Sequence, residues 1–337
     1  RHADLYYAFQ RIRSFTSDPF TSLLPEVLFQ VARYIINCLG SSPAPYGISR
    51  VHTLYTLAKQ AKALGAYKFA RFAYQKLQQL KVPSRWQDQI DFDMLAIQAK
   101  PMRDNPELLS VCYRCGETNK SLLNMDGDMC SSCLHPFIRS FINFDILPLV
   151  EFVPEDRISE EEALELIRSA PPAASDRASH DSKWHETRGD GADFLTLGED
   201  GKSGVTGIHG AVDDSTDLFS QCVNSALDKQ EYTNRYCPVV VDARTLTSLR
   251  RDEVFVTRMA VPPERAGDVL PAVGGKGKDG AFIGRLRYYK NMLAGIHVAL
   301  SQPCGRFAHE EEFEYAYLKE GGCPFSRVKD LGDYSSV

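Results

Sequence analysis

The sequence predicts a mainly α-helical protein with small β parts. Three observations carry this expectation: apolar residues recur at helical spacing through residues 3–100, cysteines then appear in close pairs, and short valine-rich and aromatic runs follow. A length of 337 residues corresponds to about two domains. Apolar residues make up 43% and charged residues 25%, as in ordinary globular proteins. No run of 18 apolar residues exists, so we expect no transmembrane segment.

The first hundred residues are predicted to form helices in pairs. Pro25 suits a first helical turn, and Gly40 suits the position just past a helix end. Ser84 followed by Gln87 predicts a capped helix start. One helix carries a single apolar stripe, formed by Leu28, Val31, Ala32, Ile35 and Leu39.

Residues 64–67, together with Ala70, Ala73 and Tyr74, are similar to a tetratricopeptide-type helical hairpin. Small residues at such a contact let two helices approach closely. We therefore expect residues 1–105 to form the end of a tetratricopeptide-like α-solenoid. An ordinary helical bundle is the alternative, because this stretch contains too few repeats to establish a period.

Four cysteines have the spacing of a tetrahedral metal site. Cys112 and Cys115 form one C-x-x-C pair, Cys130 and Cys133 form a second, and 14 residues separate the pairs. Each pair makes a tight turn that points two thiolates inward, and two such turns close a zinc site. Because sulfur fills all four positions, no position remains for a catalytic water, and one structural Zn²⁺ is expected. His135 is expected to support the site or lie at the surface.

A weaker version of this pattern lies near the C-terminus. The pairs are Ser301 with Cys304 and Cys323 with Ser326, so the outer position of each pair is serine. A serine hydroxyl is a poor zinc ligand at neutral pH. His309 is the candidate third ligand of a second site with Cys304 and Cys323. We expect instead a metal-free ribbon in which the two cysteines approach each other.

These patterns divide the chain into four parts. Residues 1–105 are the helical end, and residues 106–168 are a zinc ribbon with following strands and a helix capped by Ser159 and Glu162. Residues 169–216, rich in Gly, Ser and Asp, are expected to be a disordered linker or insertion. Residues 217–337 are expected to form an α+β module with the degenerate ribbon. Strands are expected at 137–141, 147–153, 239–241, 254–256 and 296–300.

The chain as a whole resembles the C-terminal region of the intraflagellar transport protein 122 family. The resemblance rests on residues 18–26, 56–67, 112–115, 122–124, 130–137, 149–152, 161–163, 238–241, 252–256 and 323–325. It implies propellers upstream, then a helical solenoid and zinc-bearing ends. It also implies that Cys112, Cys115, Cys130 and Cys133 hold the first zinc ion. The family tends to have cysteine where this chain has Ser301 and Ser326, which puts the second metal in question.

The resemblance also implies a function. It points to a non-enzymatic scaffold subunit of intraflagellar transport complex A, which assembles with other complex A subunits. Through them it supports retrograde transport by the ciliary dynein. Also through them, and with membrane-protein cargo adaptors as indirect partners, it supports the entry of membrane proteins into the cilium. The implied location is the cilium or flagellum, the basal body and the cytoplasm.

Two other functions stay open from the residues. The first is a nucleic-acid-binding zinc ribbon, but the net charge is −5 and no basic stripe surrounds the cysteines, so no direct nucleic-acid partner is expected. The basic residues there, Arg114, Lys120 and Arg139, are offset by Glu117, Asp126 and Asp128. The second is a RING-like ubiquitin ligase, which needs eight ligands, whereas the sequence offers four well-spaced ones and three weaker candidates.

Overall fold

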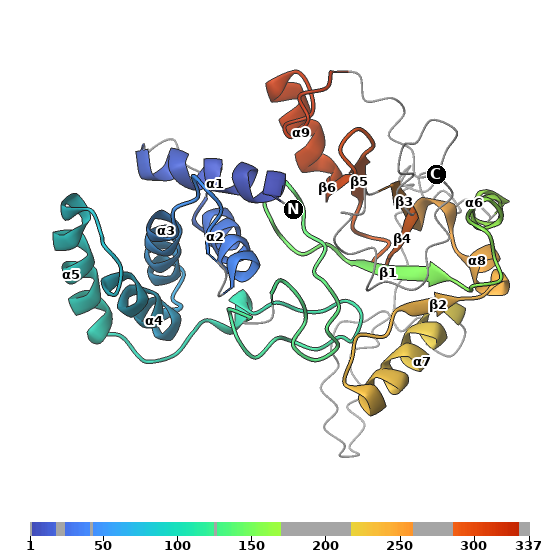
Figure 1. Cartoon of the computed structure of the whole chain (residues 1–337), viewed down its shortest axis with the longest axis horizontal. Helices are drawn as coiled ribbons and strands as arrows, with labels where there is room; N and C mark the ends of the chain where they lie inside the picture. The colour runs from blue at the N-terminus through green and yellow to red at the C-terminus, as the bar shows by residue number, and fades with distance from the viewer. Residues whose placement is uncertain are drawn as a thin grey trace, which may run out of the picture.

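The computed structural model describes residues 2–17, 24–40, 43–124, 127–169, 217–258 and 286–329. Apart from Ser169, the expected disordered segment 169–216 lies outside the described residues. Within them the protein is helix-rich with a few small sheets (Figure 1). No helix in this described part is both long and apolar enough to cross a membrane.

Five helices form the N-terminal part, and consecutive helices pack against one another (Figure 1). They are α1 (His2–Ser17), α2 (Pro25–Leu39), α3 (Arg50–Ala63), α4 (Tyr67–Gln78) and α5 (Ser84–Gln98). The predicted stripe of α2 is buried, and all of it except Leu28 belongs to the core that these helices share. Gly40 ends α2 with a φ of 48°, and Gly65 has a φ of 80° between α3 and α4, which glycine adopts without strain. Both turns therefore need glycine.

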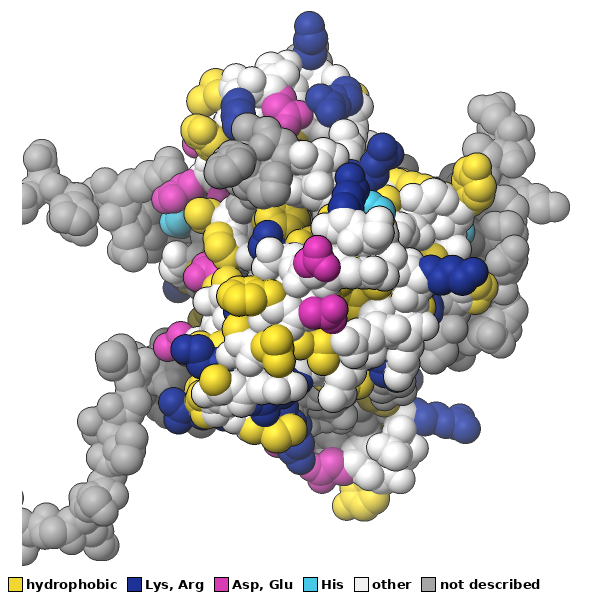
Figure 2. All heavy atoms as spheres, turned by 90° about the vertical axis from the view of Figure 1, so that its left-hand side faces the viewer, with side chains coloured by type: hydrophobic (Ala, Val, Ile, Leu, Met, Phe, Trp, Pro, Cys, Tyr) yellow, Lys and Arg dark blue, Asp and Glu magenta, His cyan; other side chains and the backbone are white. Residues whose placement is uncertain are grey.

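The outer helix of this part exposes apolar side chains. On α5, Phe92 and Leu95 are 67% and 66% exposed. Figure 2 faces this end of the molecule and shows hydrophobic side chains interspersed with polar and charged ones. The surface of the helical end is thus mixed, with its large apolar residues on the outside as well as in the core.

One of the two predicted helix caps is confirmed, and the other is wrong. Helix α6 (Glu160–Ser169) begins after Ser159, whose Oγ accepts a hydrogen bond from the Glu162 amide at 3.2 Å. Helix α5 already includes Ser84, because Pro83 occupies the capping position and no side chain caps that helix. Pro83 fixes its own φ, so the helix starts one residue earlier than expected, and the Ser84 hydroxyl lies inside the first turn.

A four-stranded sheet with the order β2-β1-β4-β3 forms the second core (Figure 1). Its strands are β1 (Leu149–Pro154), β2 (Val239–Val241), β3 (Val254–Arg258) and β4 (Leu286–Asn291). Strand β1 pairs with β2 in parallel and with β4 in antiparallel. Helices α6, α7 (Leu218–Thr233) and α8 (Ala243–Ser248) contribute to the same core. Strand β1 and helix α6 follow the ribbon in sequence but pack with residues after 217. Strand β1 lies inside the sheet, so it needs a partner strand on each side, and both partners, β2 and β4, come from that later part of the chain.

A separate hairpin brings the C-terminal residues to the first helix. It consists of β5 (Val298–Ser301) and β6 (Arg306–His309), and α9 (Glu310–Glu320) follows it. The Arg306 guanidinium lies 2.6 Å from the Asp4 carboxylate of α1, and the rings of Tyr7 and Phe325 are 5.2 Å apart. The two ends of the described chain thus lie side by side (Figure 1).

Candidate metal centre

The four paired cysteines converge on one point. The sulfur atoms of Cys112, Cys115, Cys130 and Cys133 all lie within 4.8 Å of one another. The sulfurs of Cys112 and Cys133 are 3.5 Å apart, and those of Cys115 and Cys130 are 3.7 Å apart. Zinc–sulfur bonds of about 2.3 Å in a tetrahedron place the sulfurs roughly 3.8 Å apart. The donor set and spacing therefore fit a four-thiolate zinc site.

Each cysteine pair is held by the same backbone turn, here called a knuckle. In a knuckle starting at residue i, the amide of i+4 donates to the carbonyl of i, and residue i+4 has a positive φ. Gly116 donates to Cys112 at 2.8 Å with a φ of 72°, and Leu134 donates to Cys130 at 3.1 Å with a φ of 54°. The amide of Cys130 in turn donates to the His135 carbonyl at 2.9 Å. These bonds point both sulfurs of a pair to one side.

A third knuckle lies where a strand was expected at 137–141. The Phe144 amide donates to the Ser140 carbonyl at 3.0 Å, and Phe144 has a φ of 62°. Among the described residues, this stretch forms an isolated bridge between Arg139 and Ile146, and the Phe141 amide donates to the Phe307 carbonyl at 3.0 Å, but no ladder forms. The strand prediction is wrong because a short apolar run can line a turn as well as a strand. Without cysteines, this knuckle has no signal at the level of sequence.

Hydrogen bonding within the cluster shifts the pKa values of the four thiols in opposite directions. Hydrogen bonding with Cys112 is the largest cause that lowers the pKa of Cys130 far below its usual range and that of Cys115 to about 7. The pKa of Cys112 is raised, mainly by hydrogen bonding with Cys115. Cys112 acts to lower the pKa of Cys133, but Cys115 and Cys130 outweigh it, so that pKa is raised as well. Zinc binds cysteine as the thiolate, so ionisation of these coupled thiols is linked to metal binding. The cluster thus supports one structural Zn²⁺.

His135 stands behind the cluster and is not among the clustered groups. Its side chain is buried, and its Nε2 accepts a hydrogen bond from the Glu151 amide at 3.3 Å. Burial, assisted by the charge of Arg114, lowers the pKa of His135 to about 4. The neutral imidazole therefore connects the second knuckle to the start of β1.

On one side, Arg114 fastens the ribbon to α7. Its side chain is buried and donates to the Cys133 carbonyl at 3.1 Å and to Gln230 Oε1 at 3.0 Å. It also donates to the Cys237 carbonyl at 2.6 Å, and its guanidinium lies 5.0 Å from the Tyr236 ring centre. A residue within the first cysteine pair thus reaches the second core.

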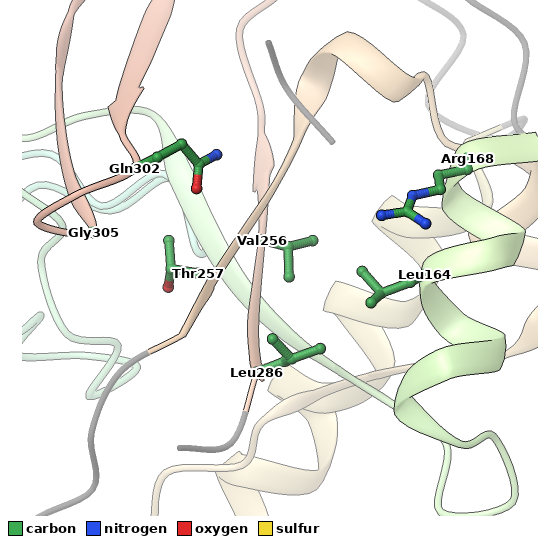
Figure 3. A pocket seen from close by; sticks show the side chains of 7 residues that line it. All are labelled: Leu164, Arg168, Val256, Thr257, Leu286, Gln302 and Gly305. Carbon is green, nitrogen blue, oxygen red and sulfur yellow. The ribbon is translucent and has the colours of Figure 1, made fainter. Parts of the chain in front are cut away.

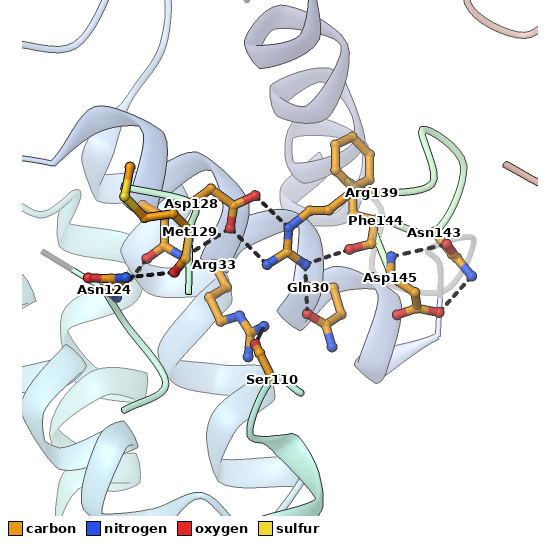
Figure 4. A network of polar contacts seen from close by, with 11 residues as sticks. Gln30, Arg33, Ser110, Asn124, Asp128, Met129, Arg139, Asn143, Phe144 and Asp145 are labelled. Carbon is orange, nitrogen blue, oxygen red and sulfur yellow. Dashed lines mark hydrogen bonds and ion pairs between the residues drawn. The ribbon is translucent and has the colours of Figure 1, made fainter. Parts of the chain in front are cut away.

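On the other side, Arg139 and Arg33 fasten the ribbon to α2 (Figure 4). Arg139 pairs with Asp128 and donates to the Phe144 carbonyl at 2.7 Å. Its Nη1 also lies 3.4 Å from Gln30 Oε1 of α2. Arg33, fully buried in α2, donates to the Leu108 carbonyl at 2.9 Å and to the Ser110 hydroxyl. The ribbon is therefore joined to the helical end by buried polar contacts.

The predicted approach of Cys304 and Cys323 is confirmed, with their sulfurs 4.0 Å apart. His309 does not join them. It pairs with Val298 at the end of the β5–β6 hairpin opposite to the turn that holds Cys304. Among the described residues, the four cysteines of the first cluster are the one group of His, Cys, Asp or Glu at metal-binding distance. The geometry gives no support to His309 as a third ligand.

An open cleft of about 360 Å³ lies between α6, the edge of the sheet and the β5–β6 turn (Figure 3). Leu164, Val256 and Leu286 form its apolar part, while Gln302 and Gly305 border it from the turn. Arg168 is the one ionisable side chain among the described residues that line it. This described lining therefore offers no acid–base pair.

The fold and the four-sulfur cluster define a zinc-ribbon protein, and residues 105–150 match the family model described as "IFT122, zinc ribbon domain". The chain is 35% identical over 325 residues to the intraflagellar transport protein 122 homolog of Danio rerio, and 35% identical over 327 residues to that of Homo sapiens. These matches cover 96% and 97% of this chain, and 24% and 23% of the relatives. The chain, homologous to the C-terminal region of intraflagellar transport protein 122, spans about a quarter of these relatives' length.

Proposed function

We propose that this chain is the C-terminal assembly region of a non-enzymatic scaffold subunit of intraflagellar transport complex A. In this proposal Cys112, Cys115, Cys130 and Cys133 are the ligands of its structural zinc ion. The metal stabilises a small module that has little apolar core of its own. When bound, zinc supplies cross-linking of the two knuckles and no catalytic water.

The observation that carries the proposal is the position of the ribbon between two packed cores. Arg114 reaches α7 and residue 237 on one side, while Arg139 lies beside α2 on the other. Because the ribbon contacts both the N-terminal helices and the core of the four-stranded sheet, it fixes the orientation in which these two parts face a partner. Such rigid presentation suits a subunit of a multi-protein assembly better than an independent catalyst.

The same contacts weigh against a nucleic-acid-binding ribbon. Two of the three basic residues near the cluster, Arg114 and Arg139, are buried and bonded within the protein. Phosphate contacts need cations that reach the solvent. A RING-like ligase needs two interleaved four-ligand sites, and the described residues bring together one.

The proposal extends to organisation and location. We propose the divisions 1–105, 106–168, 169–216 and 217–337, with residues 1–105 as the tetratricopeptide-like end of a solenoid. The partners are other complex A subunits and, through them, the ciliary dynein and membrane-protein cargo adaptors. The place of action is the cilium or flagellum and its basal body, with a cytoplasmic pool.

Co-purification with the other complex A subunits tests the function. A tagged full chain should recover them, whereas Cys115→Ser should reduce recovery because the ribbon no longer orients its neighbours. Arg235→Met, a change at an exposed residue, is the matched control. Undiminished recovery with Cys115→Ser would contradict the role of the ribbon. Salt-dependent DNA binding, or ubiquitin transfer in a purified system, would favour the alternatives.

A further inference from the structure

Two further knuckles face each other at the C-terminal hairpin. Gly305 donates to the Ser301 carbonyl at 2.8 Å, and Arg327 donates to the Cys323 carbonyl at 2.8 Å. Both donors have a positive φ, of 61° and 62°. The arrangement has the backbone signature of the first cluster, although two of its four side chains are serines.

The side chains of these knuckles form a compact group, here called the thiol–hydroxyl cluster: Ser301, Cys304, Cys323 and Ser326. The sulfur of Cys304 lies 3.1 Å from Ser301 Oγ and 4.0 Å from the sulfur of Cys323. Ser301 Oγ is also 3.5 Å from the Cys323 sulfur. Ser326 Oγ is buried and has no hydrogen-bond partner within the part of the chain that the structure describes. The two knuckles therefore hold the thiols of Cys304 and Cys323 close to each other.

This donor set does not fit a stable zinc site. Two sulfurs and two neutral hydroxyls supply half of the thiolates of the first cluster, and His309 lies at the far end of the hairpin. Without a bound cation, nothing in the donor set protects the two thiols from oxidation. The knuckles nevertheless keep the sulfurs within reach of each other.

We propose that Cys304 and Cys323 are a redox-sensitive thiol pair that closes reversibly to a disulfide. The oxidant is a low-molecular-weight disulfide such as oxidised glutathione. Gln302 and Gly305 of the β5–β6 turn border the open cleft (Figure 3). Cys304 lies in the same turn and is half-buried, so it meets the oxidant first. Cys323 is fully buried, so it reacts second, with the Cys304 sulfur that has already met the oxidant.

The chemistry balances in two exchange steps. The Cys304 thiolate attacks one glutathione sulfur, so a mixed disulfide forms and one glutathione thiolate leaves. The Cys323 thiolate then attacks the Cys304 sulfur and expels the second glutathione thiolate. The protein loses two electrons and two protons, and oxidised glutathione becomes two molecules of glutathione. Hydrogen bonds from the Ser326 amide, at 3.4 Å, and from Ser301 stabilise the attacking Cys323 thiolate.

Closure cross-links the β5–β6 turn to the segment that follows α9. The cluster packs with Phe325, whose ring contacts Tyr7 of α1. The disulfide therefore tightens the part of the C-terminal module that contacts the first helix. It restricts the unfolded chain between residues 304 and 323 and makes this module more resistant to unfolding.

Peptide mapping of the zinc-loaded full chain tests the proposal. After incubation with oxidised glutathione, alkylation of free thiols and trypsin digestion, we expect residues 291–306 joined to residues 320–327 through a disulfide. Reduced glutathione should separate them, and the cysteines of the first cluster should stay reduced. Cys304→Ser should abolish the joined peptide, whereas Cys237→Ser should leave it unchanged.

Two results would overturn the proposal. One is full alkylation of both Cys304 and Cys323 in the wild-type chain after oxidation. The other is a second equivalent of zinc in the wild-type chain that is lost in Cys304→Ser, since it would mean that the pair binds metal. Both measurements use the wild-type chain as reference, so misfolding of a variant does not decide the outcome.

Discussion

Arg139 and Asp128 form a bidentate ion pair, with Nε 2.7 Å from Oδ2 and Nη2 2.8 Å from Oδ1, although their side chains are only 4% and 9% exposed. The pair joins the third knuckle to the strand-like segment before Cys130. Asp128 also accepts a hydrogen bond from Asn37 of α2 at 3.4 Å. A buried pair that is also hydrogen-bonded is costly to break from one side, because the remaining charge loses its partner. The junction between ribbon and helical end depends on it.

Arg139→Gln should therefore lower the free energy of unfolding by about 3 kcal/mol, because Asp128 is left buried and unpaired. Arg250→Gln is the matched control: its partner is Glu253 and its side chain is 57% exposed. That change should cost no more than about 1 kcal/mol. Urea unfolding followed by circular dichroism measures both. Equal effects for the two variants would contradict the importance of the buried pair.

Cys115→Ser should remove the bound zinc, because three sulfurs and a hydroxyl hold the ion less well than four sulfurs. The purified chain should contain about one equivalent of zinc by elemental analysis, and the variant much less. The ribbon should unfold locally while helices α1 to α5 stay largely folded. Cys237→Ser should keep the zinc. Free reaction of all four cluster cysteines with a thiol reagent in the native wild-type chain would refute the site.

Arg114→Met should loosen α7 and residues 236–237 without removing zinc. The substitution keeps a similar length but leaves the Cys133 and Cys237 carbonyls and Gln230 without their donor. Amide hydrogen exchange in the variant should become faster than in the wild type in α7 and at residues 236–237. In α3, which belongs to the N-terminal helical core, it should stay the same. Arg235→Met, at an exposed residue nearby, should change neither. Unaltered exchange in α7 would show that Arg114 does not couple ribbon and sheet.

Asp217→Asn should make stability less dependent on pH in mild acid. Burial opposes ionisation of Asp217, but Lys290 and hydrogen bonds from Ser220 and the Phe219 amide outweigh it and lower its pKa. The unfolded chain then binds the proton more readily than the folded chain. The stabilisation that the Asp217 carboxylate gives to the folded chain is therefore present above about pH 4 and is lost as the pH falls below it.

Asparagine keeps the cap of α7 without the charge. The stability advantage of the wild-type chain over Asp217→Asn should therefore shrink as the pH falls from about 4.5 to about 2.5. Thermal unfolding at several pH values measures it, and Asp156→Asn, at an exposed position, serves as control. A constant difference across this range would contradict the assignment.

Ser301→Cys combined with Ser326→Cys should raise the zinc content from about one to about two equivalents, because four thiolates would then face one another in the two C-terminal knuckles. Ser140→Cys combined with Asn143→Cys is the control. It places two cysteines in the third knuckle, which has no facing cysteine pair. A second equivalent in the control as well would show that zinc binds to any such turn and not to the paired geometry.

The local patterns of the sequence were sufficient for the metal site and for much of the secondary structure. A C-x-x-C pair specifies its own tight turn, so Cys112, Cys115, Cys130 and Cys133 could be grouped before any fold was known. Helical stripes such as that of α2, and the Ser159 cap, are likewise set by neighbours within four residues. The serine–cysteine pattern at 301–304 and 323–326 was informative for the same reason.

Only the tertiary structure decided what these local units contact. The knuckle at Ser140 has no cysteine to mark it, and nothing near Arg139 in sequence indicates that Gln30 lies beside it. His309 is five residues from Cys304, yet the β5–β6 pairing carries it away from the turn. Strand β1 follows the ribbon directly but completes a sheet with residues more than eighty positions later. Such contacts depend on burial and pairing between distant segments, whereas the sequence pattern reports only the preferences of near neighbours.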